Sequence, residues 1–373
     1  MSWSIRLFRI LGIEVKVHLT FVLILIWAAY RWGVAMRLGP VGAVYGMIVI
    51  LLLFACVTVH EFAHSLTAMR FGVKVRGITL LPIGGVAQME EMPKKPKEEL
   101  IMSLAGPLTN FAIAGLLLLA AVPLHLRAGL SAAELARLMG TVSWPGLVSY
   151  LAISNLFIGI FNLLPAYPLD GGRVLRSVLA LRMDGPKATV WAVKIGQGMA
   201  WILGFLGALG GSWTLVIIAV FIYLGAGQEG RAAELKDVLD GIRVRQAMTS
   251  KVETLRLDSA LSEAVDKVLS TLQSDFPVLE EGRLAGLLTE DDLVGGLREF
   301  GPEAAVKQVM RRNIETIGPD EPLLEAQRLM GASRVKAIPV MRGGRLEGMI
   351  SSQDVGEAFL FLRLNPEILK RGT

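Results

Sequence analysis

Hydrophobic residues gather into long runs over the first 228 positions of the chain and follow a shorter, mixed pattern afterwards. A helix needs about 20 consecutive apolar residues to cross the hydrocarbon core of a bilayer. Six runs approach that length, although the first and the fifth are short. They cover residues 18–32, 41–69, 100–124, 147–165, 195–209 and 213–227. The pattern predicts an α-helical polytopic membrane domain with six transmembrane helices over residues 1–228.

The remainder of the chain is an internal duplication. Residues 244–293 align with residues 306–355 without a gap at an offset of 62, with sixteen identities over fifty positions. Unrelated segments would share about three, so the two stretches are repeats. Each copy has the pattern of a strand, an amphipathic helix, two strands joined by a glycine-containing turn, and a second helix. We therefore predict an α/β domain with repeats at 244–301 and 302–373, joined to the front part by a helix at 229–243.

Composition and charge support this division. Of the 373 residues, 53% are hydrophobic and 19% are charged, whereas a soluble protein has about a quarter charged. Residues 1–228 hold 18 Lys and Arg against 9 Asp and Glu, and the rest holds 20 against 24. Basic residues confined to loops between apolar runs indicate membrane topology, and we expect no nucleic-acid partner. The single cysteine, Cys56, excludes a disulfide framework and a zinc site built on thiolates.

The loop charges also predict orientation. Six spans place both termini on one side, and the loops of that side carry fourteen Lys and Arg, from Arg6 to Lys194. The opposite loops carry four: Arg31, Arg37, Arg127 and Arg137. Positive residues are retained on the cytoplasmic side. The chain is therefore predicted to be a multi-pass protein of the cell membrane with both termini and the repeat domain in the cytoplasm.

The second apolar run contains the sequence His60-Glu61-Phe62-Ala63-His64. On a helix, positions i and i+4 share a face, so both imidazoles can bind one metal ion, and the glutamate is placed to hold a water on it. The alternative is an accidental helical pair that packs against loops. That alternative requires a carboxylate without a partner in an apolar helix, which costs roughly 2.5 kcal/mol or more.

Two histidines are one short of the three protein ligands that a catalytic zinc takes. Of the nine carboxylates in the front part, Glu61 and Asp170 are the two within or directly against apolar span sequence. Pro165 and Pro168 prevent a regular helix before Asp170, and such a broken segment at membrane depth must line protein or a water cavity. Asp170 is therefore the predicted third ligand. A role in capping a helix that begins at Gly171 remains open, and both roles could coexist.

The front part resembles the site-2 protease family of intramembrane zinc metalloproteases. The resemblance rests on HEFAH at 60–64, NLLPAYPLDGGRVLRS at 162–177, SLAGPLTNF at 103–111 and LLPIGGVA at 80–87. It implies that His60, His64 and Asp170 bind one Zn²⁺ per chain and that Glu61 is the catalytic base. It also implies a substrate that is a transmembrane or membrane-anchored protein, such as a regulator of the anti-sigma-factor type in bacterial relatives.

A peptidase of this kind needs a donor for the charge that develops on the carbonyl oxygen. Asn162 and Asn110 are the candidates, and Asn162 is the first choice because it is nearer to Asp170 in the sequence. Both amides could instead be structural contacts between helices.

Residues 73–87 alternate in part, are rich in β-branched residues and are broken by Pro82, Gly84 and Gly85. They predict a hairpin at the membrane edge whose free strand pairs with an unwound substrate, with Leu80, Pro82, Gly84 and Gly85 as contact candidates. An ordinary cytoplasmic hairpin is the alternative.

The repeats resemble a tandem pair of CBS domains, which commonly bind adenine nucleotides in the cleft between repeats. The resemblance implies nucleotide contacts from Thr289 and Asp292 in one copy and from Ser351 and Asp354 in the other, with the aspartates at the ribose of ATP, ADP or AMP. It also implies a homodimer. The alternative is that these residues cap helices and no ligand binds, because Thr and Ser are good N-cap residues.

Together these features predict a zinc-dependent intramembrane endopeptidase regulated through its CBS pair. The alternative is a CBS-regulated transporter or channel that uses the His and carboxylate site for ions. A transporter has no need of HExxH combined with a proline-broken Asp-Gly-Gly segment.

Overall fold

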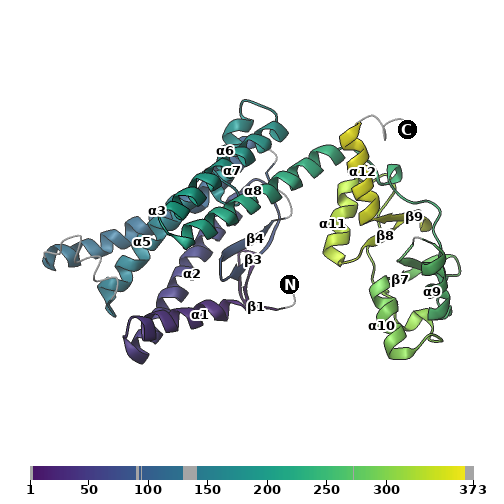
Figure 1. The fold of residues 1–373 in the computed structure, drawn as a ribbon, viewed down its shortest axis with the longest axis horizontal. Coiled ribbons are helices and arrows are strands. Elements are labelled where there is room, and N and C mark those ends of the chain that lie inside the picture. The colour runs from purple at the N-terminus through teal and green to yellow at the C-terminus, as the bar shows by residue number, and fades with distance from the viewer. Residues whose placement is uncertain (1–2, 90–91, 94, 129–140, 272, 366–373) are drawn as a thin grey trace. The chain divides into compact units, whose positions relative to one another are not determined.

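The computed structural model describes residues 3–89, 92–93, 95–128, 141–271 and 273–365. It divides the chain into two units, Met1–Arg231 and Ala232–Thr373 (Figure 1). Lys94 and Arg137, which entered the charge argument, and residues 366–373 of the second predicted repeat lie outside the described residues.

The first unit consists mainly of long apolar helices. Its helices are α1 (Phe21–Ala29), continued by a π-helical segment to Ala35, α2 (Gly39–Arg70), α3 (Pro96–Ala128), α5 (Trp144–Asn162), α6 (Asp170–Ala180), α7 (Gly185–Leu209) and α8 (Trp213–Leu239). In the described part of the chain, five of these, α2, α3, α5, α7 and α8, are long and apolar enough to cross a membrane. The first predicted run is the shorter apolar helix Phe21–Ala35. The predicted count of six is therefore approximate, and the multi-pass helical architecture is confirmed.

A four-stranded sheet accompanies these helices. Its strands are β1 (Ser4–Ile10), β2 (Ile13–His18), β3 (Val75–Leu81) and β4 (Gly84–Met89), in the order β1-β2-β3-β4. The two hairpins are antiparallel, and β2 pairs with β3 in parallel. β3 and β4 form the hairpin predicted at 73–87, whereas the N-terminal hairpin of β1 and β2 was not predicted. The sheet and α2 share one apolar core, in which the rings of Phe21 and Phe54 meet edge to face at 4.7 Å.

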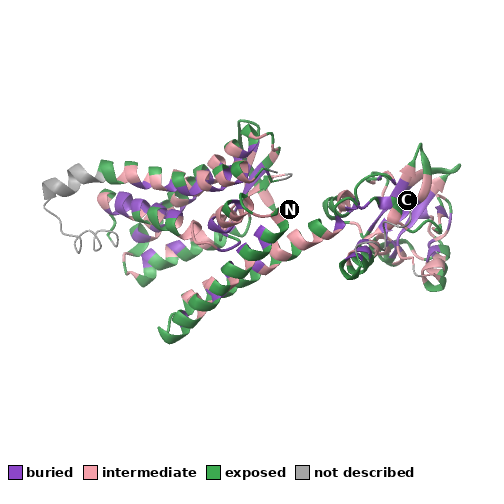
Figure 2. Ribbon diagram, turned by 90° about the horizontal axis from the view of Figure 1, so that it is seen from above, coloured by how far each residue is buried: buried purple, intermediate pink, exposed green. Residues whose placement is uncertain are grey.

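Packing within the first unit brings α3 into contact with α2, α5 and α6. α3 therefore lies among the helices that carry the predicted ligands, because His60 and His64 belong to α2 and Asp170 begins α6. Many large apolar side chains on the outer faces of these helices are exposed (Figure 2), as expected for surfaces that face lipid.

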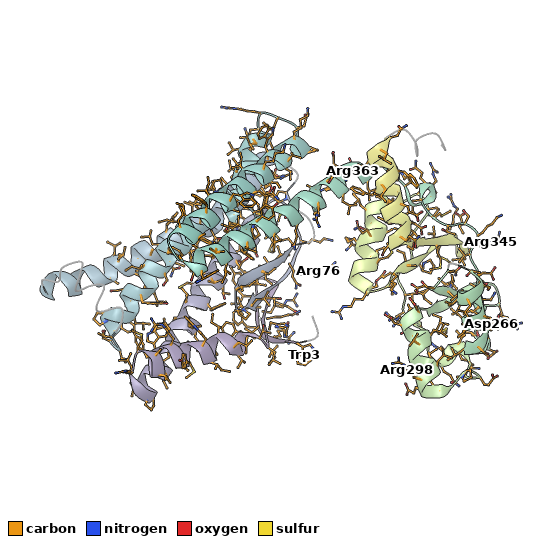
Figure 3. The ribbon with its side chains drawn as sticks, in the orientation of Figure 1. Trp3, Arg76, Asp266, Arg298, Arg345 and Arg363 are labelled. Carbon is orange, nitrogen blue, oxygen red and sulfur yellow. The ribbon has the colours of Figure 1, made fainter. Side chains whose placement is uncertain are left out.

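The second unit has the predicted duplicated α/β organisation. The first copy contains β5 (Leu255–Arg256), α9 (Leu261–Ser270), β6 (Phe276–Glu280), β7 (Arg283–Leu288) and α10 (Glu290–Phe300), and the second contains α11 (Leu323–Ser333), β8 (Ala337–Arg342), β9 (Arg345–Ser351) and α12 (Ser352–Leu364). Each copy has its own apolar core, and its strands are largely buried (Figure 2). The end of α8 packs in the core of the second copy through Leu235 and Leu239, and Glu234 of α8 is paired with Arg363 of α12 at 3.1 Å (Figure 3).

Candidate active site

The helix α2 presents two buried imidazoles one turn apart. His60 is 4% exposed and His64 is 6% exposed. Their Nε2 atoms lie 3.1 Å from each other, and their rings are at 80°. The spacing of four residues therefore produces the shared face that the sequence predicted, and both Nε2 atoms point to one place.

Asp170 reaches the same place from the start of α6. After α5 ends at Asn162 the chain is not helical until Asp170, and Pro165 and Pro168 in this segment offer no N–H group. The Oδ2 atom of Asp170 lies 3.1 Å from His64 Nε2 and 3.3 Å from His60 Nε2. The N-cap of α6 is Leu169, so the Asp170 carboxylate is directed at the imidazoles rather than serving as the N-cap.

The size of this triangle fits a zinc ion. Tetrahedral zinc with bonds of about 2.0–2.1 Å places its ligand atoms about 3.3 Å from one another. The three separations here are 3.1, 3.1 and 3.3 Å. Within the described ranges, His60, His64 and Asp170 form the group of His, Cys and carboxylate residues whose ligand atoms lie close enough for one metal ion. Two imidazoles and one carboxylate, with a fourth position left open, are a donor set typical of catalytic zinc.

The far nitrogen of each imidazole is fixed by a hydrogen bond. His64 Nδ1 donates to the carbonyl oxygen of Met102 at 2.7 Å. His60 Nδ1 donates to Asn110 Oδ1, and Asn110 Nδ2 donates to Asn155 Oδ1 at 2.8 Å. Since the proton is then on Nδ1 in both rings, both Nε2 lone pairs are free for a metal.

These bonds give Asn110 a structural role. Its amide oxygen accepts from His60, one of its two amide hydrogens is donated to Asn155, and the residue is fully buried. The residue therefore orients His60, and its role as an oxyanion donor stays a prediction. Asn155, whose amide donates to Leu151 O at 2.8 Å, was missed by the sequence analysis. Its only signal was an amide inside the apolar run at 147–165.

The backbone of α3 lies directly against the two rings at Gly106. A β-carbon at this position would come 2.6 Å from His60 Nε2 and still closer to His64 Nε2. Real β-carbons do not make such contacts, so α3 can approach the site only with glycine here. Gly106 lies within the 103–111 motif, but its contact with the imidazoles was not predicted.

Glu61, next to His60 on α2, lies against the outer strand of the sheet. A β-carbon at Gly85 of β4 would come 2.5 Å from Glu61 Cγ. Gly84 and Gly85 thus belong to an edge strand beside the glutamate. Pro82 lies in the turn before β4. Leu80 is buried in β3 and pairs with Val17 on one side and Gly85 on the other, so its backbone is not free to pair with a substrate.

Asn162 is the last residue of α5 and opens the segment that leads to Asp170. Its side chain is half-buried. Among the described residues, the Asn162 amide has no hydrogen-bond partner. In this it differs from the Asn110 amide.

The four nucleotide candidates lie at two helix starts in the second unit. Thr289 is the N-cap of α10 and accepts a hydrogen bond from the Asp292 N–H at 3.2 Å. Ser351 is the N-cap of α12 and accepts one from the Asp354 N–H at 3.1 Å. Both residues therefore cap helices, and the two aspartates lie in the first turn of each helix.

Comparison with known proteins is consistent with this geometry. Residues 48–203 match the model of peptidase family M50, and residues 244–299 and 306–360 match that of the CBS domain. A protein of Methanocaldococcus jannaschii named as a zinc metalloprotease is 32% identical over 99% of both chains. One of Mycobacterium tuberculosis, also named as a zinc metalloprotease, is 31% identical over 98% of this chain and 95% of its own length. The solved structure of a site-2 protease from M. jannaschii is 36% identical over 61% of this chain and 96% of its own, with a TM-score of 0.44.

Proposed function

The chain belongs to peptidase family M50 and carries a tandem CBS pair, and on that premise we propose that it is an intramembrane zinc endopeptidase. It hydrolyses a peptide bond in or near a transmembrane segment of another membrane protein. The observation that carries this proposal is the triangle of His60 Nε2, His64 Nε2 and Asp170 Oδ2, with sides of 3.1–3.3 Å, built on apolar helices.

In this proposal His60, His64 and Asp170 hold one zinc ion per chain. When bound, zinc acidifies water and polarises a peptide carbonyl. Glu61 accepts the proton of the attacking water on its carboxylate and returns it to the leaving amine. Its position next to His60 on α2 and against Gly85 supports this role. Asn162 donates a hydrogen bond to the developing negative charge on the carbonyl oxygen. Its amide is available for this because no described residue forms a hydrogen bond with it.

The position of the site along α2 supports chemistry inside the membrane. His60 precedes Arg70, the last residue of α2, by ten residues, which corresponds to about 15 Å of helix. With the positive loops and both termini in the cytoplasm, water reaches the site from the cytoplasmic side. A peptide bond cleaved there must be drawn out of a substrate helix, because the carbonyl of an intact helix is hydrogen-bonded.

We propose that β4 holds the unwound substrate. It is the outer strand of its sheet, so one row of backbone N–H and C=O groups is available for a further strand. Gly84 and Gly85 are its first residues, and Gly85 contacts Glu61. A substrate strand added to this edge therefore lies next to the catalytic base. The substrate is a membrane-anchored regulator of the anti-sigma-factor type.

The CBS pair regulates the peptidase domain by binding an adenine nucleotide at the Thr289 and Asp292 or the Ser351 and Asp354 positions. The functional parts are a membrane peptidase over 1–228, a connecting segment over 229–243, whose helical part is the end of α8 and stops at Leu239, and CBS repeats over 244–301 and 302–373. Pairing of two CBS domains between chains forms a homodimer.

The test is the variant Glu61→Gln in the full chain, reconstituted with a transmembrane substrate. We expect cleavage to fall by at least 1,000-fold, since the shape of the side chain is kept and its basicity is lost. Zinc content, measured by mass spectrometry, remains one per chain. The matched control is Glu98→Gln in the first turn of α3, a half-buried residue paired with Lys95; this variant keeps its activity.

If Glu61→Gln cleaved the substrate at the wild-type rate, Glu61 would not be the catalytic base. If the purified wild-type chain contained no zinc, the proposed metal site would be refuted. Ion flux through reconstituted vesicles that survives substitution of both histidines would favour the transporter interpretation instead.

A further inference from the structure

The two CBS repeats offer an internal comparison, because each position has an equivalent 62 residues further on. Thr249 corresponds to Arg311, and Leu287 corresponds to Met349. The structure keeps this equivalence in the backbone. Thr249 exchanges two hydrogen bonds with Met349, both of 2.9 Å, and Arg311 exchanges two with Leu287, also of 2.9 Å. The residues at 249 and 311 therefore hold the same place relative to Asp354 and Asp292, respectively.

The side chains at this place differ in chemistry. Arg311 forms a two-pronged ion pair with Asp292, from Nε to Oδ2 at 2.6 Å and from Nη2 to Oδ1 at 3.3 Å. The Thr289 hydroxyl also donates to Asp292 Oδ2 at 2.6 Å. Both oxygens of Asp292 are thus engaged and its charge is neutralised within the protein.

Asp354 is left with an oxygen that has only a weak partner. Its Oδ2 accepts from the N–H and the hydroxyl of Ser351 at 2.8 and 2.7 Å. Its Oδ1 meets the Thr249 hydroxyl at 3.3 Å, outside the usual range of about 2.5–3.0 Å for such a bond. In the part of the chain that the structure describes, Asp354 forms no ion pair with a Lys or Arg side chain.

We propose that the CBS pair binds one ribonucleotide rather than two, at Asp354, and that Arg311 closes the equivalent position at Asp292. This inference rests on the nucleotide regulation in the proposed function. A ribose presents two neighbouring hydroxyls that donate to a carboxylate. At Asp354 they replace one weak hydrogen bond, whereas at Asp292 they would have to displace a charge-assisted pair that neutralises the same oxygens.

The experiment is calorimetric titration of AMP into the purified full chain in detergent, with ADP and ATP as further probes. We expect one site per wild-type chain. Asp354→Asn weakens binding by about 10- to 100-fold, the effect of losing hydrogen bonds to a charged group. Asp292→Asn leaves one site. Arg311→Thr, which gives the first position the residue of the second, raises the number to two.

The reciprocal variant Thr249→Arg removes the single site, with the unfolding temperature of the chain as its folding control. Two sites in the wild-type chain, or one site that is lost in Asp292→Asn and kept in Asp354→Asn, would overturn the inference and leave nucleotide regulation standing. Absence of binding by all three nucleotides to both wild type and Arg311→Thr would instead remove the nucleotide part of the proposed function, without bearing on the peptidase.

Discussion

The buried amide chain behind His60 gives the sharpest prediction for the metal site. Asn110→Leu keeps the approximate shape of the side chain and removes both of its polar groups. His60 Nδ1 and Asn155 Oδ1 then lose their partners in a place where water cannot replace them, because Asn110 and Asn155 are fully buried. An unsatisfied buried polar group costs about 1–3 kcal/mol, and His60 can avoid that cost by turning away from the metal.

We therefore expect zinc to bind about 10- to 100-fold more weakly in Asn110→Leu, the range found when the hydrogen-bond partner of a metal-binding imidazole is removed. The assay is competition for zinc with a chromophoric chelator in detergent. Asn110→Asp, which keeps an acceptor for His60, loses less affinity than Asn110→Leu.

The control is Thr109→Val on the same helix, because the Thr109 hydroxyl only bonds Ala105 O and its loss leaves zinc binding unchanged. Wild-type zinc affinity in Asn110→Leu, measured together with an unaltered unfolding temperature, would show that His60 does not depend on this amide for its orientation.

Three further outcomes follow from the same structure. Gly106→Ala forces α3 away from the imidazoles and abolishes stoichiometric zinc binding. The control is Gly115→Ala on the same helix, which binds zinc normally because a β-carbon there has no atom within 4 Å. Equal zinc content in both variants would refute the close approach of α3. Glu99→Gln breaks the ion pair between the Glu99 carboxylate, which is 4% exposed, and Arg176 of α6. We expect the free energy of unfolding to fall by roughly 2 kcal/mol, less than for a fully buried pair because Arg176 is partly exposed. An unchanged unfolding temperature would contradict this. Burial raises the pKa of Asp275, so its contribution to stability is present below the unfolded pKa and is lost as the pH rises through the folded pKa. Asp275→Asn should therefore raise the unfolding temperature more at pH 7.5 than at pH 4.5, and an equal gain at both would argue against a buried charged Asp275.

The sequence predicted those parts of the site that depend on local geometry. His60 and His64 meet because a helix brings positions i and i+4 together, and HExxH is visible in any single chain. Asp170 could be found because an apolar environment leaves few carboxylates to choose from. Gly106 and Asn155 could not be found in this way, because their roles arise where α3 and α5 pack on the site, at distances along the chain that no spacing rule covers. The contact of Asn110 with His60 could not be predicted for the same reason.

The sequence repeat in the CBS pair likewise does not predict every contact. The offset of 62 predicts two equivalent halves, and the backbone bridges at Thr249 and Arg311 obey it. Yet one exchange of threonine for arginine decides whether the facing carboxylate is neutralised. The more open aspartate, Asp354, precedes Val355 of the apolar core that also holds Leu235 and Leu239 from the end of α8. A ligand that orders the start of α12 therefore acts on the repeat into which α8 is built, and a site at Asp292 would act on the other core. The asymmetry thus places the proposed signal in the repeat that is continuous with the last helix of the membrane domain.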